Sequence, residues 1–351
     1  MAKILSVIIP TYNMEKYLQR CLDSLLIPHL EDIEVLIIND GSKDNSLVIA
    51  RQYEAKYPES FRVYDKKNNN YGSCVNCGLK EITGKYVKIL DADDYFEIEN
   101  FDALIEQLKT IDCDLVITDY VVFDEADHPI QKVSYALPAD DKLEFFEILP
   151  ETDRIAMHAV TYKSSIFKQI YYHQTEGVSY TDEEWIFLPM AMVRSVFYMG
   201  KVIYKYLVGR SGQTVTPSVT IKNMHHFIVG IYNMIASYST LPINIPDSNL
   251  SYLNQRLKKR IVAQYKKVLW LYYGKIDRNI LVDFDSQLKQ LNSSLYHAIS
   301  DACVAKRIPF KYIKYWRCHQ HLTGLTVFPF FVLHIMLRLH TAFRRLYGHG
   351  Y

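Results

Sequence analysis

The sequence predicts an α/β fold in which a mostly parallel sheet is sandwiched between helices, with a helical extension after it. Over the first 120 residues, short runs of apolar and β-branched residues alternate with segments whose apolar residues recur at helical spacing. The apolar runs end at Pro, Asn or Asp, which are typical of turns. Strands that alternate with helices form right-handed βαβ units, whose parallel sheet is covered on both faces.

The elements follow one another regularly up to residue 108. The apolar runs predict strands over residues 5–9, 33–38, 61–64 and 86–90. Helical spacing between and after them predicts helices over residues 15–26, 46–57, 75–82 and 101–108. Ligands of a parallel sheet bind beyond the carboxyl ends of its strands, so the residues that follow each run are the first candidates for a functional site.

The rest of the chain divides into an irregular part and a helical part. Between residues 114 and 206, strand-like pieces surround a helix that starts near Asp182. Beyond residue 223, the periodicity predicts long helices over residues 226–238, 250–273 and 280–303. We expect a first domain over residues 1–220, with halves 1–110 and 111–220, and a helical C-terminal region over residues 221–351.

Composition excludes several classes of protein. Apolar residues make up 49% of the 351 residues and charged residues 23%, which is the balance of a globular protein and not of a disordered chain. The formal net charge of +1 argues against a dedicated nucleic-acid binder. Six scattered cysteines, and a start without a secretory pattern, favour a reducing cytoplasmic location.

The neutral total charge hides a basic tail. Residues 306–351 contain eight Lys and Arg residues and no Asp or Glu. The aromatic-rich apolar run 322–337 falls short of the ~20 residues of a spanning helix, and predicts a helix in the interface of an anionic membrane, kinked at Pro329. A core helix or a contact in a homo-oligomer is the alternative. We therefore expect a peripheral protein on the inner face of the cytoplasmic membrane.

Acidic residues follow two of the predicted strands. Asp40 comes directly after the second strand, and Gly41 allows a tight turn there. This carboxylate can accept a hydrogen bond from a nucleobase N–H or a ribose hydroxyl, although Asp-Gly is also an ordinary turn. Asp91, Asp93 and Asp94 follow the fourth strand, and three acids in four residues repel one another unless a cation or hydrogen bonds compensate. This loop predicts a divalent metal site that shares its cation with substrate phosphates.

A third acidic cluster, Asp182, Glu183 and Glu184, opens a predicted helix. Acids at a helix N-terminus are stabilised by the helix dipole, which is the structural alternative. A carboxylate at this position can also accept the proton of a substrate hydroxyl while that hydroxyl attacks.

Three segments occur in order: 6–13 (Ser-Val-Ile-Ile-Pro-Thr-Tyr-Asn), 39–46 (Asn-Asp-Gly-Ser-Lys-Asp-Asn-Ser) and 90–95 (Leu-Asp-Ala-Asp-Asp-Tyr). With them the chain resembles family 2 glycosyltransferases of the GT-A fold, strongly over the first part of the chain and weakly up to Gln213. The resemblance implies a nucleotide-sugar-binding, Rossmann-like α/β sandwich. It also implies an enzyme that inverts the anomeric carbon without a covalent intermediate.

The resemblance also assigns roles to individual residues. Pro10, Thr11 and Tyr12 would form a loop around the uridine of a UDP-sugar. Asp40 would contact the uracil, and Asp91 would lie near the ribose.

The remaining roles concern the diphosphate and the acceptor. Asp93 would hold Mg²⁺ or Mn²⁺ against the diphosphate, and Arg210 would bind a phosphate. Asp182 would be the catalytic base, with Glu184 as second candidate, because the register of this motif is ambiguous by two residues.

We therefore expect a metal-dependent inverting glycosyltransferase, of the hexosyl or N-acetylhexosaminyl type, that uses a UDP-sugar and a glycan acceptor. A lipid-linked acceptor in bacterial surface polysaccharide synthesis would agree with the basic tail. The alternatives are a processive polysaccharide synthase and a noncatalytic nucleotide-sugar-binding or scaffolding protein. The intact Asp91, Asp93 and Asp182 argue against the noncatalytic alternative.

Overall fold

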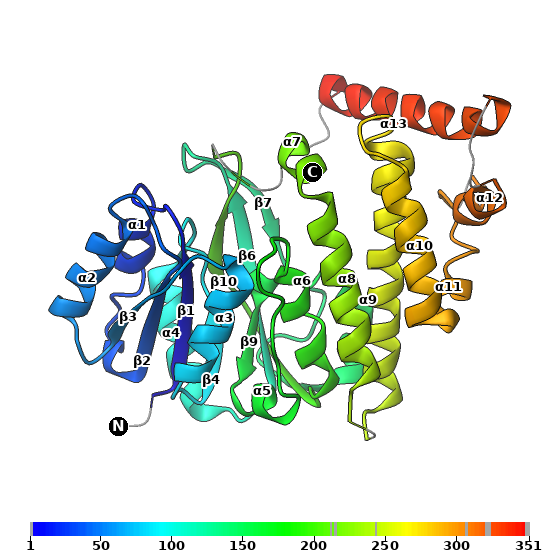
Figure 1. Ribbon diagram of the computed structural model, residues 1–351. Coiled ribbons are helices and arrows are strands. Elements are labelled where there is room, and N and C mark those ends of the chain that lie inside the picture. Colours follow the sequence, from blue (N-terminus) through cyan, green and yellow to red (C-terminus); the bar gives the residue numbers. More distant parts are fainter. Residues whose placement is uncertain are drawn as a thin grey trace. The chain divides into compact units, whose positions relative to one another are not determined.

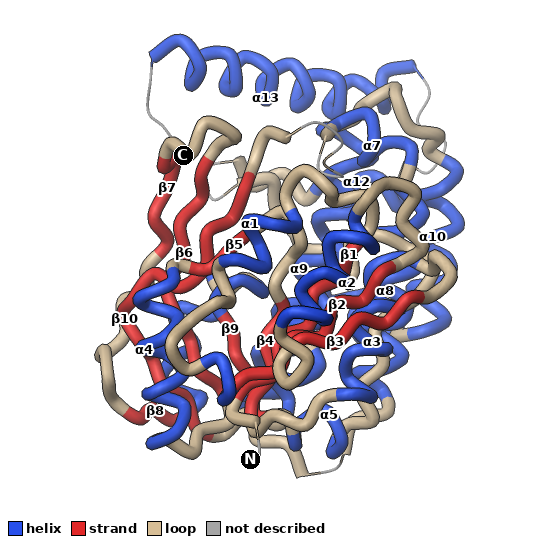
Figure 2. The backbone as a smooth tube through the Cα atoms, turned by 90° about the vertical axis from the view of Figure 1, so that its left-hand side faces the viewer, coloured by secondary structure: helices blue, strands red, loops and turns tan. Residues whose placement is uncertain are grey.

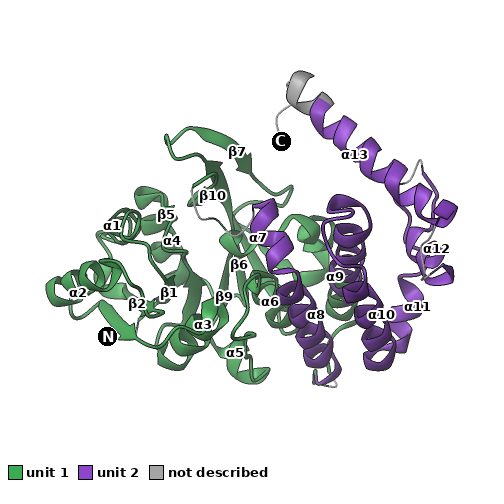
Figure 3. Cartoon of the chain, turned by 45° about the horizontal axis from the view of Figure 1, so that its top comes forward, with its two compact units in different colours: residues 1–213, 241–253 green, residues 214–240, 254–351 purple. Residues whose placement is uncertain are grey.

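The computed structural model describes residues 3–210, 213, 216–242, 244–305, 308–319 and 324–347. The chain divides into two compact units (Figure 3). Unit 1 consists of Met1–Gln213 and Leu241–Leu253, and unit 2 of Thr214–Thr240 and Asn254–Tyr351. The sequence analysis placed a single boundary near residue 220, whereas residues 241–253 return to unit 1.

Buried hydrogen bonds explain this return. The side-chain amide of Asn249 donates to the backbone carbonyls of Met190 and Val193, at 2.7 and 2.8 Å. The Tyr252 hydroxyl donates to the carbonyl of Ile186. These bonds satisfy buried backbone carbonyls of unit 1, which would otherwise lose their water partners on folding.

Unit 1 is built on one sheet, in which ten strands are found among the described residues. The main path runs in the order β3 (Phe61–Asp65), β2 (Ile33–Asn39), β1 (Leu5–Thr11), β4 (Tyr86–Ile89), β9 (Val160–Lys163), β6 (Leu115–Phe123), β10 (Ser195–Leu207) and β5 (Tyr95–Phe96). Off this path, β7 (Pro129–Val133) pairs with β6, and β8 (Lys142–Glu144) pairs with β10.

The sheet has a parallel half and a mixed half (Figure 2). β3, β2, β1 and β4 are parallel, as the alternation of strands and helices predicts. β9 pairs antiparallel with both β4 and β6, while β6 and β10 are parallel.

Helices cover both faces of the parallel half (Figure 1). On one face, α1 (Leu18–Asp23), α2 (Ser46–Lys56) and α4 (Ile98–Thr110) share a buried core with alternate residues of β1 and β2. On the other face lies α3 (Asn70–Glu81), where a Cβ at Gly78 would be 2.6 Å from the Ile8 side chain. Successive strand residues point to opposite faces, so β1 is buried on both.

The other helical elements of unit 1 are short. They are α5 (Ser165–Gln169), α6 (Asp182–Trp185) and the 3₁₀ turns η1 (Leu30–Asp32), η2 (Phe145–Arg154), η3 (Met157–Ala159) and η4 (Leu188–Ala191).

Unit 2 is helical, as the periodicity beyond residue 223 predicts. Its elements are α7 (Pro217–Lys222), α8 (Met224–Ser239), most of α9 (Asp247–Lys266), the π-helical turn η5 (Lys267–Leu271), α10 (Asn279–Leu291), α11 (Ser293–Ala298), α12 (Tyr312–Cys318), the 3₁₀ turn η6 (Gly324–Val327) and α13 (Phe328–Tyr347). The helix predicted over 280–303 is two helices, because Asn292 leaves the helical conformation and its side chain caps α11 at the Leu295 N–H, 2.9 Å away.

The last helix differs from its sequence prediction. Pro329 lies in the first turn of α13, a position where proline is tolerated, and so marks the start of this helix, whereas the sequence analysis predicted a kink inside a longer one. The segment Gly324–Ala342, with a mean hydropathy of 1.5, is by length and composition alone sufficient to cross a membrane, and 11% of it is buried.

Candidate active site

The carboxyl ends of β1, β2 and β4 bring three predicted residues to one edge of the sheet. β1 pairs with both β2 and β4, so Thr11, Asp40 and Asp91 lie at the ends of neighbouring strands. The Asp40 N–H donates a hydrogen bond to the Thr11 carbonyl at 2.8 Å. Pro10 and Thr11 are buried, whereas Tyr12 beyond them is 43% exposed. Tyr12 is therefore the side chain of this loop that a ligand can reach.

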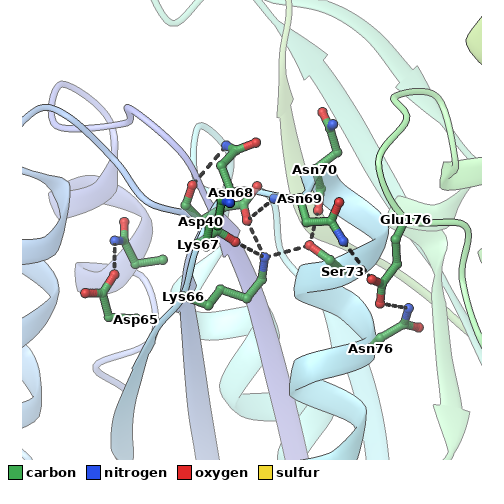
Figure 4. A network of polar contacts seen from close by, with 11 residues as sticks. Asp40, Asp65, Lys66, Lys67, Asn68, Asn69, Asn70, Ser73, Asn76 and Glu176 are labelled. Atoms are coloured by element: carbon green, nitrogen blue, oxygen red, sulfur yellow. Dashed lines mark hydrogen bonds and ion pairs between the residues drawn. The ribbon is translucent and has the colours of Figure 1, made fainter.

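Asp40 is buried in a network that links β2 to α3 (Figure 4). Its carboxylate accepts hydrogen bonds from the ammonium group of Lys66 and from the backbone N–H of Asn69, the latter at 3.0 Å. The same ammonium donates to the Ser73 hydroxyl at 2.6 Å. A nucleobase that binds Asp40 would thus share the carboxylate with Lys66. The sequence analysis missed Lys66, whose only signal is a basic residue directly after the third strand.

The loop after β4 holds its first and last acids in different ways. Asp91 accepts a hydrogen bond from the Tyr71 hydroxyl at 2.7 Å. Both oxygens of Asp94 are engaged by β10, through the Tyr204 hydroxyl at 2.6 Å and the Leu207 N–H at 2.7 Å. Burial, and then the charge of Asp93, raise the pKa of Asp94 well above its ordinary value. Asp94 therefore fastens the loop to β10.

Asp91 has the electrostatics of a cation ligand. Burial raises the pKa of Asp91 to about 7, and the charges of Asp93 and Asp182 act in the same direction. A cation beside this carboxylate would stabilise its ionised form and so lower that pKa again.

Asp93 and Arg210 form an ion pair. Their side chains are only 12% and 13% exposed, although the two residues are 117 positions apart in the sequence. The structure thus brings the predicted metal ligand and the predicted phosphate ligand into direct contact. The Arg210 guanidinium already supplies positive charge at the Asp93 carboxylate.

The acidic cluster of α6 separates into two kinds of side chain. Asp182 is exposed, and its charge contributes to raising the pKa of both Asp91 and Tyr71, so it lies within electrostatic range of these side chains. Glu184 is buried, and its carboxylate accepts the backbone N–H of Thr175 at 2.8 Å. Asp182, and not Glu184, is therefore the acid of the two that a substrate can reach from solvent.

The loop before α6 contacts α3 through its buried residues Gln174 and Thr175. The side-chain amide of Gln174 donates to the carbonyl and the hydroxyl of Thr181, both at 2.9 Å. Its backbone N–H donates to the Asn76 side chain at 2.8 Å, and Asn76 donates back to the Gln174 carbonyl at 2.8 Å. A Cβ at Gly72 would lie 2.0 Å from the Thr175 carbonyl oxygen, so only glycine allows this close approach. The sequence analysis did not identify Gln174, which carries no recognisable motif.

The acids of the loop after β4 fit a divalent cation. Among the described residues, Asp91, Asp94 and His158 offer ligand atoms within 4.8 Å of one another. The oxygens of Asp94 are engaged by β10, and His158 is buried with its ring stacked on Tyr206, where burial lowers the pKa of His158 to about 3. Because hard divalent cations prefer carboxylate oxygens, Asp91 is the member of this group best suited to a cation. Asp93, on the same loop, lies outside the group and is paired with Arg210.

Known glycosyltransferases resemble this chain in sequence. The family model described as Glycosyl transferase family 2 matches residues 6–171. Glycosyltransferase GlyA of Streptococcus pneumoniae serotype 4 is 27% identical over 216 residues, which are 58% of this chain and 30% of GlyA. The uncharacterized glycosyltransferase EpsJ of Bacillus subtilis is 38% identical over 116 residues, or 33% of either chain. The chain therefore matches no more than a third of the length of these two relatives.

Solved structures resemble the chain over most of its length. S. aureus TarS 1–349 in complex with UDP-GlcNAc superposes with a TM-score of 0.61 at 19% identity, over 83% of this chain and 82% of TarS. Its complex with UDP gives a TM-score of 0.66 at 16% identity, over 96% and 92%. Fold and acidic loops together define an α/β domain of the GT-A fold. The match to glycosyl transferase family 2 covers residues 6–171, slightly less than half of the chain.

Proposed function

We propose that the chain is a metal-dependent inverting glycosyltransferase, which moves a sugar from a UDP-sugar to a hydroxyl group of a glycan acceptor. The observation that carries this proposal is the position of the exposed Asp182 within electrostatic reach of Asp91. An acid that faces the metal-binding loop from the solvent side can receive an acceptor hydroxyl between itself and the donor. Inverting transfer requires this arrangement, because acceptor and leaving group lie on opposite sides of the anomeric carbon.

The chemistry then follows as a single displacement. The acceptor oxygen attacks C1 of the sugar while its proton passes to the Asp182 carboxylate. The bond from C1 to the diphosphate oxygen breaks, and the nucleoside diphosphate leaves with the electron pair. Since no side chain is glycosylated, one displacement inverts the configuration at C1.

Asp91 and Asp93 would hold the Mg²⁺ or Mn²⁺ ion. When bound, this cation would neutralise the negative charge that develops on the diphosphate. Arg210 would exchange its contact with Asp93 for a phosphate oxygen, because charge-assisted hydrogen bonds from a guanidinium favour phosphate geometry.

The substrates are inferred from chemistry and likeness. The UDP-GlcNAc and UDP bound to TarS support a UDP-sugar donor, with a hexosyl or N-acetylhexosaminyl group. The acid-free segment 306–351 supports an acceptor anchored at a membrane, such as a lipid-linked glycan of a bacterial surface polysaccharide.

The test is nucleotide release from UDP-, GDP- and dTDP-sugars in the presence of Mn²⁺, Mg²⁺ or EDTA. Wild type is compared with Asp93→Ala and Asp182→Asn, and with Asp141→Asn, which changes an exposed acid on a loop elsewhere in unit 1. We expect metal-dependent UDP release by wild type and by Asp141→Asn only.

Other outcomes would point elsewhere. Metal-dependent nucleotide binding without turnover, for every acceptor tried, would favour a noncatalytic binding protein. Long polymeric products from a single acceptor molecule would favour a processive synthase. If none of the nucleotide sugars binds, the proposal is wrong.

A further inference from the structure

An apolar stripe runs along the outward face of α13. Thirteen large hydrophobic side chains are exposed among the described residues, and six of them lie between residues 325 and 339. They are Leu325, Phe328, Phe331, Ile335, Met336 and Leu339. We call them the outer stripe. Leu325 lies in the 3₁₀ turn η6, directly before α13. The other five lie in α13, where steps of three and four residues, with Ile335 and Met336 adjacent, put them on one side of the helix.

The opposite side of α13 is already packed within unit 2. Phe330 is fully buried, with its ring centroid 6.0 Å from that of Tyr315, and Leu333 is 7% exposed. His334 donates from Nδ1 to the carbonyl of Trp270. The helix is therefore apolar on two sides, and the contacts of unit 2 use only one. The outer stripe is left as a contiguous apolar surface of the kind that marks an interaction site.

Basic side chains border the outer stripe. Arg338 is exposed and precedes Leu339 of the stripe in the chain. With the exposed Lys275 it also lines a cavity of about 720 Å³, whose α13 residues His334 and Leu337 lie outside the stripe. Arg278 lies over the Tyr273 ring at 4.9 Å, and that ring is 6.3 Å from the Phe331 ring. The acid next to this group, Asp277, accepts a hydrogen bond from the backbone N–H of Asn279 at 3.0 Å. The residues next to the stripe are thus mainly aromatic and cationic.

We infer that the outer stripe of α13 docks on an anionic lipid surface, with the helix lying in the plane of the membrane interface. Six apolar side chains with basic residues beside them, in a segment without acids, match this surface in both hydrophobicity and charge. Docking removes large apolar side chains from water, and basic residues close to anionic lipid add an electrostatic attraction.

Two other placements fit the observations less well. A second copy docked through the same stripe would bring two acid-free segments together, so that like charges would oppose each other. A spanning helix would lose the packing of Phe330 and Leu333 and carry the charged Arg338 toward the hydrocarbon.

The test is flotation of the full chain with vesicles of phosphatidylcholine alone, or with phosphatidylglycerol added. We expect binding to the anionic vesicles, weaker binding at raised salt, and little binding to phosphatidylcholine. The variant Leu325→Ser/Phe328→Ser/Leu339→Ser should lose it, while Lys275→Gln/Arg338→Gln should lose the preference for anionic lipid. The matched control, Val48→Ser/Phe146→Ser, removes two apolar side chains that are 56% and 60% exposed in unit 1 and should bind like wild type.

The readout is independent of sugar transfer, so the inference and the proposed function can fail separately. Circular dichroism establishes that each variant is folded. Absence of wild-type binding to anionic vesicles would overturn the inference, as would retention on the vesicles after an alkaline carbonate wash, which indicates a spanning helix. A wild-type dimer that the triple variant dissociates, without any vesicle binding, would assign the stripe to a second copy instead.

Discussion

The side-chain amide of Gln174 donates hydrogen bonds to two oxygens of Thr181, the residue directly before Asp182. Both side chains are buried, so the bonds fix the start of α6 and the direction in which Asp182 leaves it. We predict that Gln174→Ala lowers kcat for sugar transfer by about tenfold or more, since small misplacements of a base are costly, and changes KM for the donor little. Steady-state kinetics with Gln107→Ala, on α4, as control would check this. A loss confined to KM would contradict a positioning role.

The approach of Gly72 to the Thr175 carbonyl makes a second prediction. Alanine in a helix interior is about 1 kcal/mol better than glycine, but a Cβ 2.0 Å from a backbone oxygen forces the loop to move, and such overpacking costs about 1–3 kcal/mol. Gly72→Ala should therefore lower the thermal midpoint, whereas Gly200→Ala, whose nearest neighbour would be 3.5 Å away, should not. Equal midpoints for the two variants would mean that the loop yields freely.

The parallel half of the sheet could be predicted because its signal is local. Each strand and helix there is a contiguous run, and the carboxyl ends of neighbouring parallel strands must meet at one edge, so Asp40 and Asp91 could be placed without coordinates. The insertion of β9 between β4 and β6 could not be predicted in this way. It depends on pairing between segments about 45 to 75 residues apart, which no local periodicity encodes.

The hydrogen-bond partners of the site residues could not be predicted from the sequence for the same reason. Lys66 reaches Asp40 over 26 residues, and Gln174 reaches Asn76 over 98. The choice between Asp182 and Glu184 needed the burial of Glu184, because two acids two residues apart in a helix point to different faces. Where in the chain the acids lie was predictable, but which neighbour holds each of them was not.

Separate substitutions of Asp182 and Glu184 should show which of the two is the catalytic base and which has a structural role. Asp182→Asn removes the proton acceptor, so turnover should fall by about 10²–10⁴-fold while donor binding is retained. Glu184→Gln keeps an oxygen that can accept the Thr175 N–H, so turnover should stay near wild type. Turnover assays, together with calorimetric measurement of donor binding, distinguish the two variants. A larger loss of turnover in Glu184→Gln would make Glu184 the base.

The ion pair between Arg210 and Asp93 predicts graded effects at Arg210. A hydrogen bond to a charged group contributes about 1.5–3 kcal/mol, so Arg210→Gln should lower kcat/KM for the donor about 10- to 100-fold. Arg210→Lys should recover part of the loss, because lysine keeps the charge but not the planar pair of donors. If lysine and glutamine variants are equally impaired, the guanidinium geometry and not its charge is what the donor requires.

The buried lysine Lys88 should change how the free energy of unfolding depends on pH. The ammonium group of Lys88 is fully buried and donates to the carbonyls of His158 and Val160, at 2.8 and 3.1 Å. Burial lowers the pKa of Lys88 to about 7, from 10.5 in an exposed lysine. Between these two values the unfolded chain binds more protons than the folded one, so the free energy of unfolding rises with pH.

Lys88→Met removes this titration from both states. The free energy of unfolding of wild type minus that of the variant should therefore rise from about pH 7 to about pH 10.5 and be flat below pH 7. Urea unfolding at a series of pH values measures this difference, and the other titrating groups cancel in it. Lys80→Met, on the exposed side of α3, is the matched control, and its difference from wild type should not change with pH. Parallel curves for wild type and Lys88→Met would show that Lys88 keeps its ordinary pKa in the fold, with water or a carboxylate reaching its ammonium group.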